Sequence, residues 1–279
     1  MLTHSKTLFA QAKLEKFAIP ATNFIDSSSA RTYCRVAEER GLPLILAFAQ
    51  SHRHFLTLEE AAAIGKTVAE EVSVPIVLHL DHGEDLEYVE RAIELGFTSV
   101  MIDASRESFE DNVVLTKQVV ELAHAKGIVV EAELGHVGSN GLSESSKLTN
   151  SIYTEVDKVL DFIEATQVDS LAISIGTAHG IYKGEPKINF ERLGEIAELT
   201  STPLVLHGGS SSGDENLGRC AREGISKINI YSDFLVGAQQ EIIAQGAQDY
   251  VSIKEAADQG MAKVLYHYYD VFGTKAVEV

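Results

Sequence analysis

The chain has 279 residues, and its 23 basic and 41 acidic side chains give a formal net charge of −18. This charge disfavours nucleic acid or an anionic membrane as a partner, although a local site of backbone N–H groups and a metal ion can still bind phosphate. The length suits one large α/β domain.

No signal peptide or membrane-spanning segment is evident, because the first residues lack an apolar core and no apolar run approaches the length of a spanning helix. The two cysteines, Cys34 and Cys220, fall in helix-like stretches and are too few for a disulfide framework. We therefore expect a soluble, cytoplasmic protein.

From about residue 17, apolar β-branched runs alternate with amphipathic helical stretches, a pattern typical of βαβ units and a parallel sheet. Eight strand-and-helix repeats in 279 residues favour a closed barrel over an open doubly wound sheet. We predict a single-domain (β/α)8 TIM barrel over residues 1–279, with an additional C-terminal helix at 252–272. Strands are expected at 17–23, 44–48, 76–81, 99–102, 128–133, 170–175, 204–206 and 227–230, and helices at 56–72, 86–95, 108–126, 154–166 and 190–199.

Two connections are long and polar, residues 135–153 after the fifth predicted strand and 176–189 after the sixth. Long loops in a compact domain are usually lids or binding loops, and the loops after the strands of such a barrel lie on its catalytic face. These two loops are therefore expected to border the active site.

Three histidines fall at the C-terminal ends of predicted strands: His82, His179 and His207. Three neutral imidazoles with an open fourth position form a catalytic zinc site, although cobalt or manganese would also suit them. A lone histidine is more often a hydrogen-bonded core or surface residue, but three at one rim indicate a metal centre. His52, His54 and His136 lie on the same face, where they could touch substrate.

Carboxylates share this rim. Asp81 adjoins His82 and could carry a proton to or from a substrate hydroxyl, or else accept a hydrogen bond from a metal-binding imidazole. His79, two residues earlier, is expected to be an interior support. Glu131 and Glu133 end the fifth predicted strand on one face, and either could be a second metal position or the partner of a nearby lysine.

A glycine- and serine-rich segment, HGGSSSG at residues 207–213, precedes the helix after the seventh predicted strand. Free N–H groups and hydroxyls at a helix start bind anions, and Ser232 supplies another hydroxyl after the eighth strand. The loops after strands seven and eight are the common phosphate site of these barrels. The sequence therefore predicts a phosphate site beside the metal centre.

These residues resemble the class II, metal-dependent ketose-bisphosphate aldolases, which include fructose-bisphosphate and tagatose-bisphosphate aldolases. The similarity runs through most of the chain in the order of the family. The matching pieces are HLDHG at 79–83, EAELG at 131–135, YT at 153–154, DSLAISIGTAHGIYKGEPKINFERL at 169–193, LHGGSS at 206–211 and KINIYSD at 227–233.

The resemblance implies a zinc-type site at His82, His179 and His207, with Asp81 as proton donor and acceptor. Glu133 matches the family's extra carboxylate near the metal, which leaves room for a second ion or a monovalent cation. In the loop after the fifth strand, Glu144 is the acid expected to exchange a proton with dihydroxyacetone phosphate. The implied substrate-binding residues are Asn23, Gly180, Gly208, Gly209, Ser210, Ser211, Asn229 and Ser232.

The implied reaction is the reversible aldol cleavage of a ketose 1,6-bisphosphate, of fructose or tagatose type, to dihydroxyacetone phosphate and an aldehyde. The sequence departs from the family pattern at residues 21–23, at Tyr231 and in the loop after strand five. These departures concern recognition of the aldehyde half of the substrate. An aldolase for another phosphorylated keto-sugar or keto-acid is therefore the alternative.

Two further interpretations are a non-catalytic aldolase partner subunit, which should have lost its ligands or acid, and a metal-dependent hydrolase, which has no need of a phosphate site. The Ala- and Tyr-bearing C-terminal helix predicts a homodimer or homotetramer.

Overall fold

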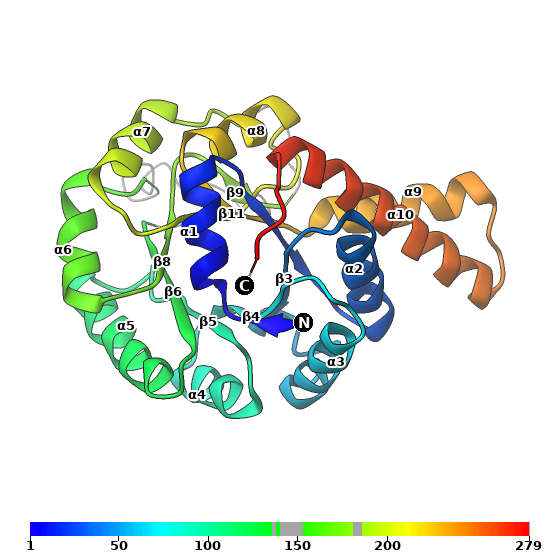
Figure 1. Ribbon diagram of the computed structural model, residues 1–279, viewed down its shortest axis with the longest axis horizontal. Helices are drawn as coiled ribbons and strands as arrows, with labels where there is room; N and C mark the ends of the chain where they lie inside the picture. Colours follow the sequence, from blue (N-terminus) through cyan, green and yellow to red (C-terminus); the bar gives the residue numbers. More distant parts are fainter. Residues whose placement is uncertain (136–137, 140–152, 181–185, 279) are drawn as a thin grey trace.

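The computed structural model of the protein describes residues 1–135, 138–139, 153–180 and 186–278 (Figure 1). Glu144 and His136 lie outside the described residues.

Eight parallel strands form a closed barrel with helices around its outside (Figure 1). Pairing of β4 with β5 and of β11 with β2 completes the ring, which confirms the predicted (β/α)8 barrel. The predicted strands agree with the observed ones to within two residues at every end. In ring order the strands are β2 (Ile19–Asn23), β3 (Leu44–Ala49), β4 (Ile76–Gly83), β5 (Ser99–Ile102), β6 (Val129–Leu134), β8 (Ser170–Ile173), β10 (Leu204–Leu206) and β11 (Ile225–Ile230).

Helices follow the strands and cover the barrel, and the predicted C-terminal helix is present. Among the described helices, none combines the length with the apolar composition that a bilayer crossing needs. They are α1 (Ser5–Glu15), α2 (Ser27–Arg40), the 3₁₀ turn η1 (Gln50–His52), α3 (Leu58–Glu70), α4 (Leu86–Leu95), α5 (Phe109–His124), α6 (Val156–Thr166), α7 (Phe190–Leu199), α8 (Asp214–Glu223), α9 (Ser232–Gln245) and α10 (Tyr250–Phe272).

Three short strands were not predicted. β1 (Leu2–Thr3) pairs with the start of β4, at the amino end of the barrel. β7 (Gly138–Ser139) and β9 (Ala178–His179) form a separate two-stranded sheet. The expectation that His179 ends the sixth barrel strand is therefore corrected, because that strand stops at Ile173 and His179 lies on β9.

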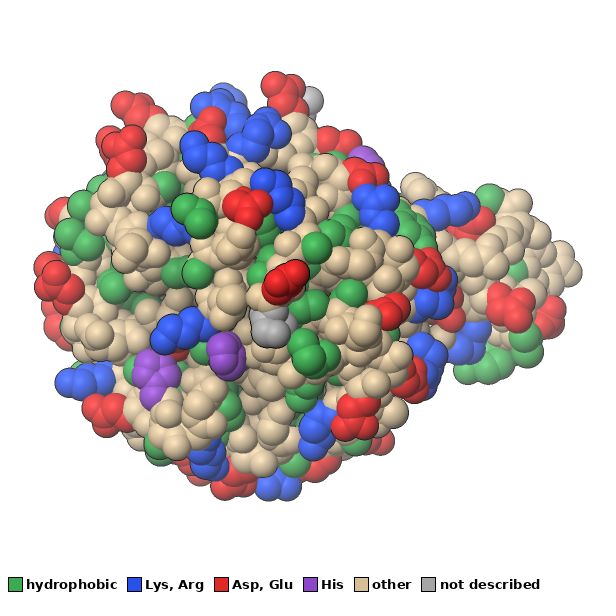
Figure 2. Space-filling model, in the orientation of Figure 1, with side chains coloured by type: hydrophobic (Ala, Val, Ile, Leu, Met, Phe, Trp, Pro, Cys, Tyr) green, Lys and Arg blue, Asp and Glu red, His purple; other side chains and the backbone are tan. Residues whose placement is uncertain are grey.

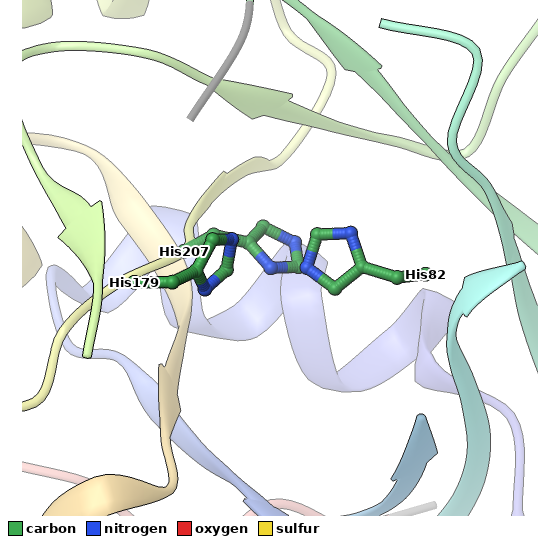
Figure 3. Close-up of side chains that lie close together, drawn as sticks. All are labelled: His82, His179 and His207. Atoms are coloured by element: carbon green, nitrogen blue, oxygen red, sulfur yellow. The ribbon is translucent and has the colours of Figure 1, made fainter. Parts of the chain in front are cut away.

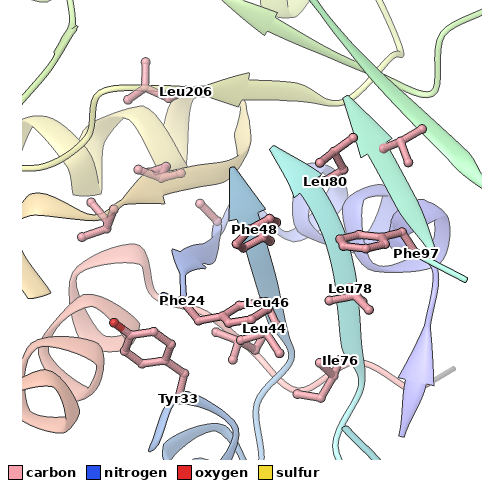
Figure 4. Packing of buried hydrophobic residues seen from close by; sticks show 14 of the residues in the cluster. Phe24, Tyr33, Leu44, Leu46, Phe48, Ile76, Leu78, Leu80, Phe97 and Leu206 are labelled. Carbon is pink, nitrogen blue, oxygen red and sulfur yellow. The ribbon is translucent and has the colours of Figure 1, made fainter. Parts of the chain in front are cut away.

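The alternation of side chains along the strands separates two faces of the barrel wall. In β3 and β4, residues such as Leu46, Phe48 and Leu78 point outward and pack beneath the helices (Figure 4). Their neighbours point inward, and Ile45 and Val77 pack with side chains of α1 in a smaller cluster at the amino end. Helix α1 therefore closes the amino end of the barrel, which leaves the carboxyl end for the site.

Helices α9 and α10 form an antiparallel pair that projects from the barrel, called here the arm (Figure 1). The two helices touch through glycines, since a Cβ added at Gly260 would overlap the carbonyl oxygen of Gly237. Only a residue without a side chain allows the backbones to approach so closely.

Candidate active site

A pocket of about 300 Å³ opens at the carboxyl ends of the barrel strands. It brings together most of the residues that the sequence singled out, from strands that are far apart in the chain. Those lining it are Asn23, Asp81, His82, Glu133, His179, Gly180, Gly208, Ser210, Asn229 and Ser232.

The end of β4 directs two consecutive side chains into this pocket, Asp81 and His82. Neighbours on a regular strand would face opposite sides. Here the pairing of β4 with β5 shifts register between Leu80 and Gly83, and His82 has a φ of 47°. A bulge with one residue in the left-handed region therefore turns both the acid and the imidazole inward.

The three predicted imidazoles meet at one point (Figure 3). The ring centre of His82 lies 4.9 Å from that of His179 and 4.5 Å from that of His207. One nitrogen from each ring lies within 4.8 Å of the others, which is close enough for all three to share one ion.

Carboxylates hold two of these rings from behind. Asp103 Oδ2 lies 2.7 Å from His82 Nδ1, and Glu131 Oε1 lies 2.9 Å from His207 Nε2. The remaining nitrogens, His82 Nε2 and His207 Nδ1, are buried and have no hydrogen-bond partner in the described part of the chain. Each of these two imidazoles thus has one nitrogen bound to a carboxylate and the other nitrogen unbound, as expected of metal ligands.

The electrostatics of the rings differ. Burial, followed by repulsion from His82 and His207, lowers the pKa of His179 to about 3. Burial and His82 also lower the pKa of His207. Burial would lower the pKa of His82 as well, but the carboxylates of Asp81 and Asp103 reverse this and raise that pKa to about 10. Two of the three rings are thus held neutral, as ligands must be.

Asp81 is buried on the floor of the pocket and accepts two amide hydrogen bonds. Asn23 Nδ2 donates to Oδ2 at 2.8 Å, and Asn229 Nδ2 donates to Oδ1 at 3.0 Å. Burial alone would raise the pKa of Asp81, but His82 and other nearby cationic groups outweigh it and hold the pKa below its ordinary value. The carboxylate is therefore fixed in position and ionised.

The two glutamates of β6 have different surroundings. Lys227 Nζ lies 2.7 Å from Glu131 Oε2 and 3.1 Å from His79 Nε2, and all three side chains are buried. Glu133 instead forms a second possible cation group with His82 and Asp103. Of the alternatives that the sequence left open, Glu131 is the lysine's partner and Glu133 lies near the histidines.

The loop after β10 brings backbone close to the imidazoles. Gly208 has a φ of 67°, and a Cβ there would lie 2.6 Å from the carbonyl oxygen of Ala178. Ser210 Oγ accepts a hydrogen bond from the N–H of Tyr231 at 3.1 Å, which joins this loop to the end of β11. Gly208, Ser210 and Ser232 thus form one continuous wall of the pocket.

Two other predicted residues of this loop point elsewhere. Ser211 donates through its N–H and its hydroxyl to Asp233, at 2.9 and 3.0 Å, and Asp233 also accepts from the hydroxyl of Tyr268. The N–H of Gly209 donates to the carbonyl of Asn229 at 3.1 Å. Neither Gly209 nor Ser211 lines the pocket in this structure.

The pocket also contains residues that the sequence did not nominate. Asp103 and Arg106 follow β5, and Glu84 follows β4. The only sequence signal for them is polar character directly after a predicted strand. Of the two histidines after β3 that were expected on this face, His52 lines the pocket, with its ring centre 4.6 Å from that of Tyr231, and His54 does not.

Comparisons with known proteins agree with this architecture. Residues 3–276 match the family described as fructose-bisphosphate aldolase class-II. The structure is similar to the YdjI aldolase from Escherichia coli K12, with 30% identity over 98% of each chain and a TM-score of 0.88. A protein from Coccidioides immitis, provisionally named a fructose-1,6-bisphosphate aldolase, is 27% identical over 95% of this chain and 94% of its own, with a TM-score of 0.86.

Proposed function

Because this chain belongs to the class-II fructose-bisphosphate aldolase family, and is therefore an aldolase, we propose that it cleaves a phosphorylated ketose with the help of a divalent ion. The products would be dihydroxyacetone phosphate and an aldehyde, and the substrate a ketose 1,6-bisphosphate of fructose or tagatose type. The observation that carries the proposal is the meeting of His82, His179 and His207 beside the ionised Asp81.

His82, His179 and His207 would hold the ion, and Zn²⁺ is the ion that three imidazoles suit best. When bound, it would supply a Lewis acid that stabilises the negative charge developing on the ketose oxygens. Glu133 lies near enough to His82 and Asp103 to offer a position for a second or monovalent cation.

Asp81 would act as the base in cleavage. It takes the proton of the C4 hydroxyl, the C4 oxygen becomes the aldehyde carbonyl, and the C3–C4 bond breaks. The bonding electron pair stays with C3 on the dihydroxyacetone phosphate half. Because Asn23 and Asn229 fix both carboxylate oxygens, the base is positioned before the substrate arrives.

The proton that C3 then needs is assigned to Glu144, which lies outside the described residues. In the opposite direction the same residue would remove that proton from dihydroxyacetone phosphate.

The phosphate of the dihydroxyacetone half would bind at the wall formed after β10 and β11. Gly180, Gly208, Ser210, Asn229 and Ser232 line this side, where small residues leave backbone and hydroxyl groups accessible. Gly209 and Ser211 would support this wall from behind. The proposal agrees with the usual phosphate position of such barrels.

The test combines metal analysis with an aldol assay. Purified protein should contain one equivalent of Zn²⁺ or a similar ion and cleave fructose or tagatose 1,6-bisphosphate, and chelation followed by Zn²⁺ should abolish and restore cleavage. Activity unchanged after complete metal removal would overturn the metal-dependent mechanism. A metal-loaded protein inactive on both bisphosphates, yet active on another phosphorylated keto-sugar or keto-acid, would establish the alternative substrate class.

A further inference from the structure

The pocket has two chemically different ends. Ser210 and Ser232, on the phosphate wall, follow β10 and β11. The opposite end is lined by Glu84 and Arg106, which follow β4 and β5. In the ring of eight strands β5 stands halfway around from β11, so Arg106 lies across the barrel mouth from Ser232.

Arg106 is the only lysine or arginine among the described residues that line the pocket, and its side chain is exposed. Asp103, the acid three residues before Arg106, is already occupied: one carboxylate oxygen pairs with His82, and the other accepts from the N–H and hydroxyl of Ser105. No acidic side chain of the described chain forms an ion pair with Arg106. Its guanidinium is therefore available to a ligand.

Asp81 lies between these two ends and marks the C4 position of a bound ketose, since it would take the C4 hydroxyl proton. With the phosphate of the dihydroxyacetone half on the wall near Ser232, the carbons beyond C4 must extend toward the loops after β4 and β5. These carbons belong to the aldehyde product. The cation therefore faces the far end of the aldehyde half.

We propose that Arg106 is a specificity residue that binds a terminal anion, a carboxylate or a phosphate, on the aldehyde half of the substrate. This inference rests on the proposed aldol reaction and adds the chemistry of the second substrate end. A planar guanidinium binds either anion through two parallel hydrogen bonds. Glu84 shares this end of the pocket, and its negative charge opposes an anion there.

The experiment compares aldehydes as acceptors for dihydroxyacetone phosphate in the condensation direction. One pair of aldehydes compares glyceraldehyde 3-phosphate with glyceraldehyde, and the other compares succinic semialdehyde with butyraldehyde. The protein should prefer the anionic member of at least one pair by about 10- to 100-fold in kcat/KM. The pair with the larger ratio of kcat/KM values identifies phosphate or carboxylate as the terminal group.

Arg106→Ala should reduce that preference to about threefold or less, by loss of activity on the anionic aldehyde alone, and Arg106→Lys should retain part of it. Glu84→Gln should increase it. The matched control is Arg53→Ala, which removes an exposed arginine that does not line the pocket and should leave the preference unchanged.

Proton exchange of dihydroxyacetone phosphate in deuterated water, with no aldehyde present, separates the two proposals. Wild type and Arg106→Ala should exchange equally, because this half-reaction does not use the far end of the pocket. Absence of exchange in the metal-loaded wild type would refute the proposed function. Three results would overturn the role of Arg106. They are normal exchange without any preference for anionic aldehydes, a preference that is unchanged in Arg106→Ala, and a preference that decreases in Glu84→Gln.

Discussion

Asp81 and His82 are adjacent in sequence, yet the bulge at the end of β4 brings both side chains into the same pocket. Asp81→Asn keeps the shape and the two asparagine neighbours but removes the proposed base. We expect kcat for cleavage to fall by about 100-fold or more, with metal content unchanged. Steady-state kinetics and metal analysis measure the two effects.

Asp161→Asn, an exposed acid on α6, provides the matched control and should keep wild-type kcat. If Asp81→Asn retained more than about a tenth of the wild-type kcat, Asp81 would not be the base.

The raised pKa of His82, about 10, would make the proposed metal binding depend on pH. Below that value the ion must displace a proton from His82, whereas His179 and His207, with lowered pKa values, release none. Affinity for Zn²⁺ should therefore rise by about tenfold per pH unit between about pH 7 and 9. Competition with a chelator of known pH dependence gives the slope.

Asp103→Asn removes one of the carboxylates that raise the His82 pKa, so the slope should flatten in this variant. An affinity that is constant above about pH 7.5 in the wild type would mean that His82 titrates like an ordinary histidine.

The sequence was sufficient to predict which histidines and which aspartate reach the carboxyl rim, because strand ends can be located from the apolar runs. It was not sufficient to predict which neighbour each side chain would meet. Glu131 and Glu133 share a strand face, and only the way the barrel closes, which brings Lys227 of the non-adjacent β11 across to β6, decides that Lys227 binds Glu131. Arg106 and Asp103 were missed for the same reason.

Among the elements of the fold, the close contact of α9 with α10 depends on glycine at position 260. Gly260→Ala would place a methyl group against the Gly237 carbonyl and should lower the free energy of unfolding by about 1–3 kcal/mol. Chemical denaturation monitored by circular dichroism measures the change.

Gly194→Ala is the matched control, since it also adds one methyl group within a helix, α7, where no atom lies within 4 Å. It should raise the free energy of unfolding by about 0.5–1 kcal/mol, because alanine has the higher helix propensity. Equal effects of the two substitutions would mean that the arm's helices do not depend on this contact.

Barrel strands and their covering helices could be predicted because each carries its own periodicity over several residues. β9 could not, since a two-residue strand has no period and forms only through pairing with β7. His179 was nevertheless placed on the correct face, because the chain after β8 has too few residues to leave the rim.

For the whole molecule, the arm provides a test of the expected homodimer or homotetramer. It stands out from the barrel with apolar side chains on its surface (Figure 2). Ile243, Tyr250 and Val251, around the turn between α9 and α10, are 71%, 77% and 62% exposed. If a second copy of the chain covers them, Ile243→Glu should shift the protein to a smaller species in light scattering after size exclusion.

Val114→Glu is the control for this experiment, because Val114 is 63% exposed on α5 and lies outside the arm. It should leave the molar mass unchanged. A wild type that is already monomeric, or an assembly that withstands Ile243→Glu, would contradict assembly through the arm.

Asp233, in the first turn of α9, accepts hydrogen bonds both from Ser211 behind the proposed phosphate wall and from Tyr268 of α10. These hydrogen bonds couple the arm to the proposed phosphate wall. A displacement of α9 would move its first residue, Ser232, together with the loop after β10. If the chain assembles through the arm, assembly and binding of the sugar phosphate would be energetically linked. Substrate should slow hydrogen exchange in the arm. Dissociation of the subunits should weaken phosphate binding by the same free energy by which bound substrate stabilises the assembly.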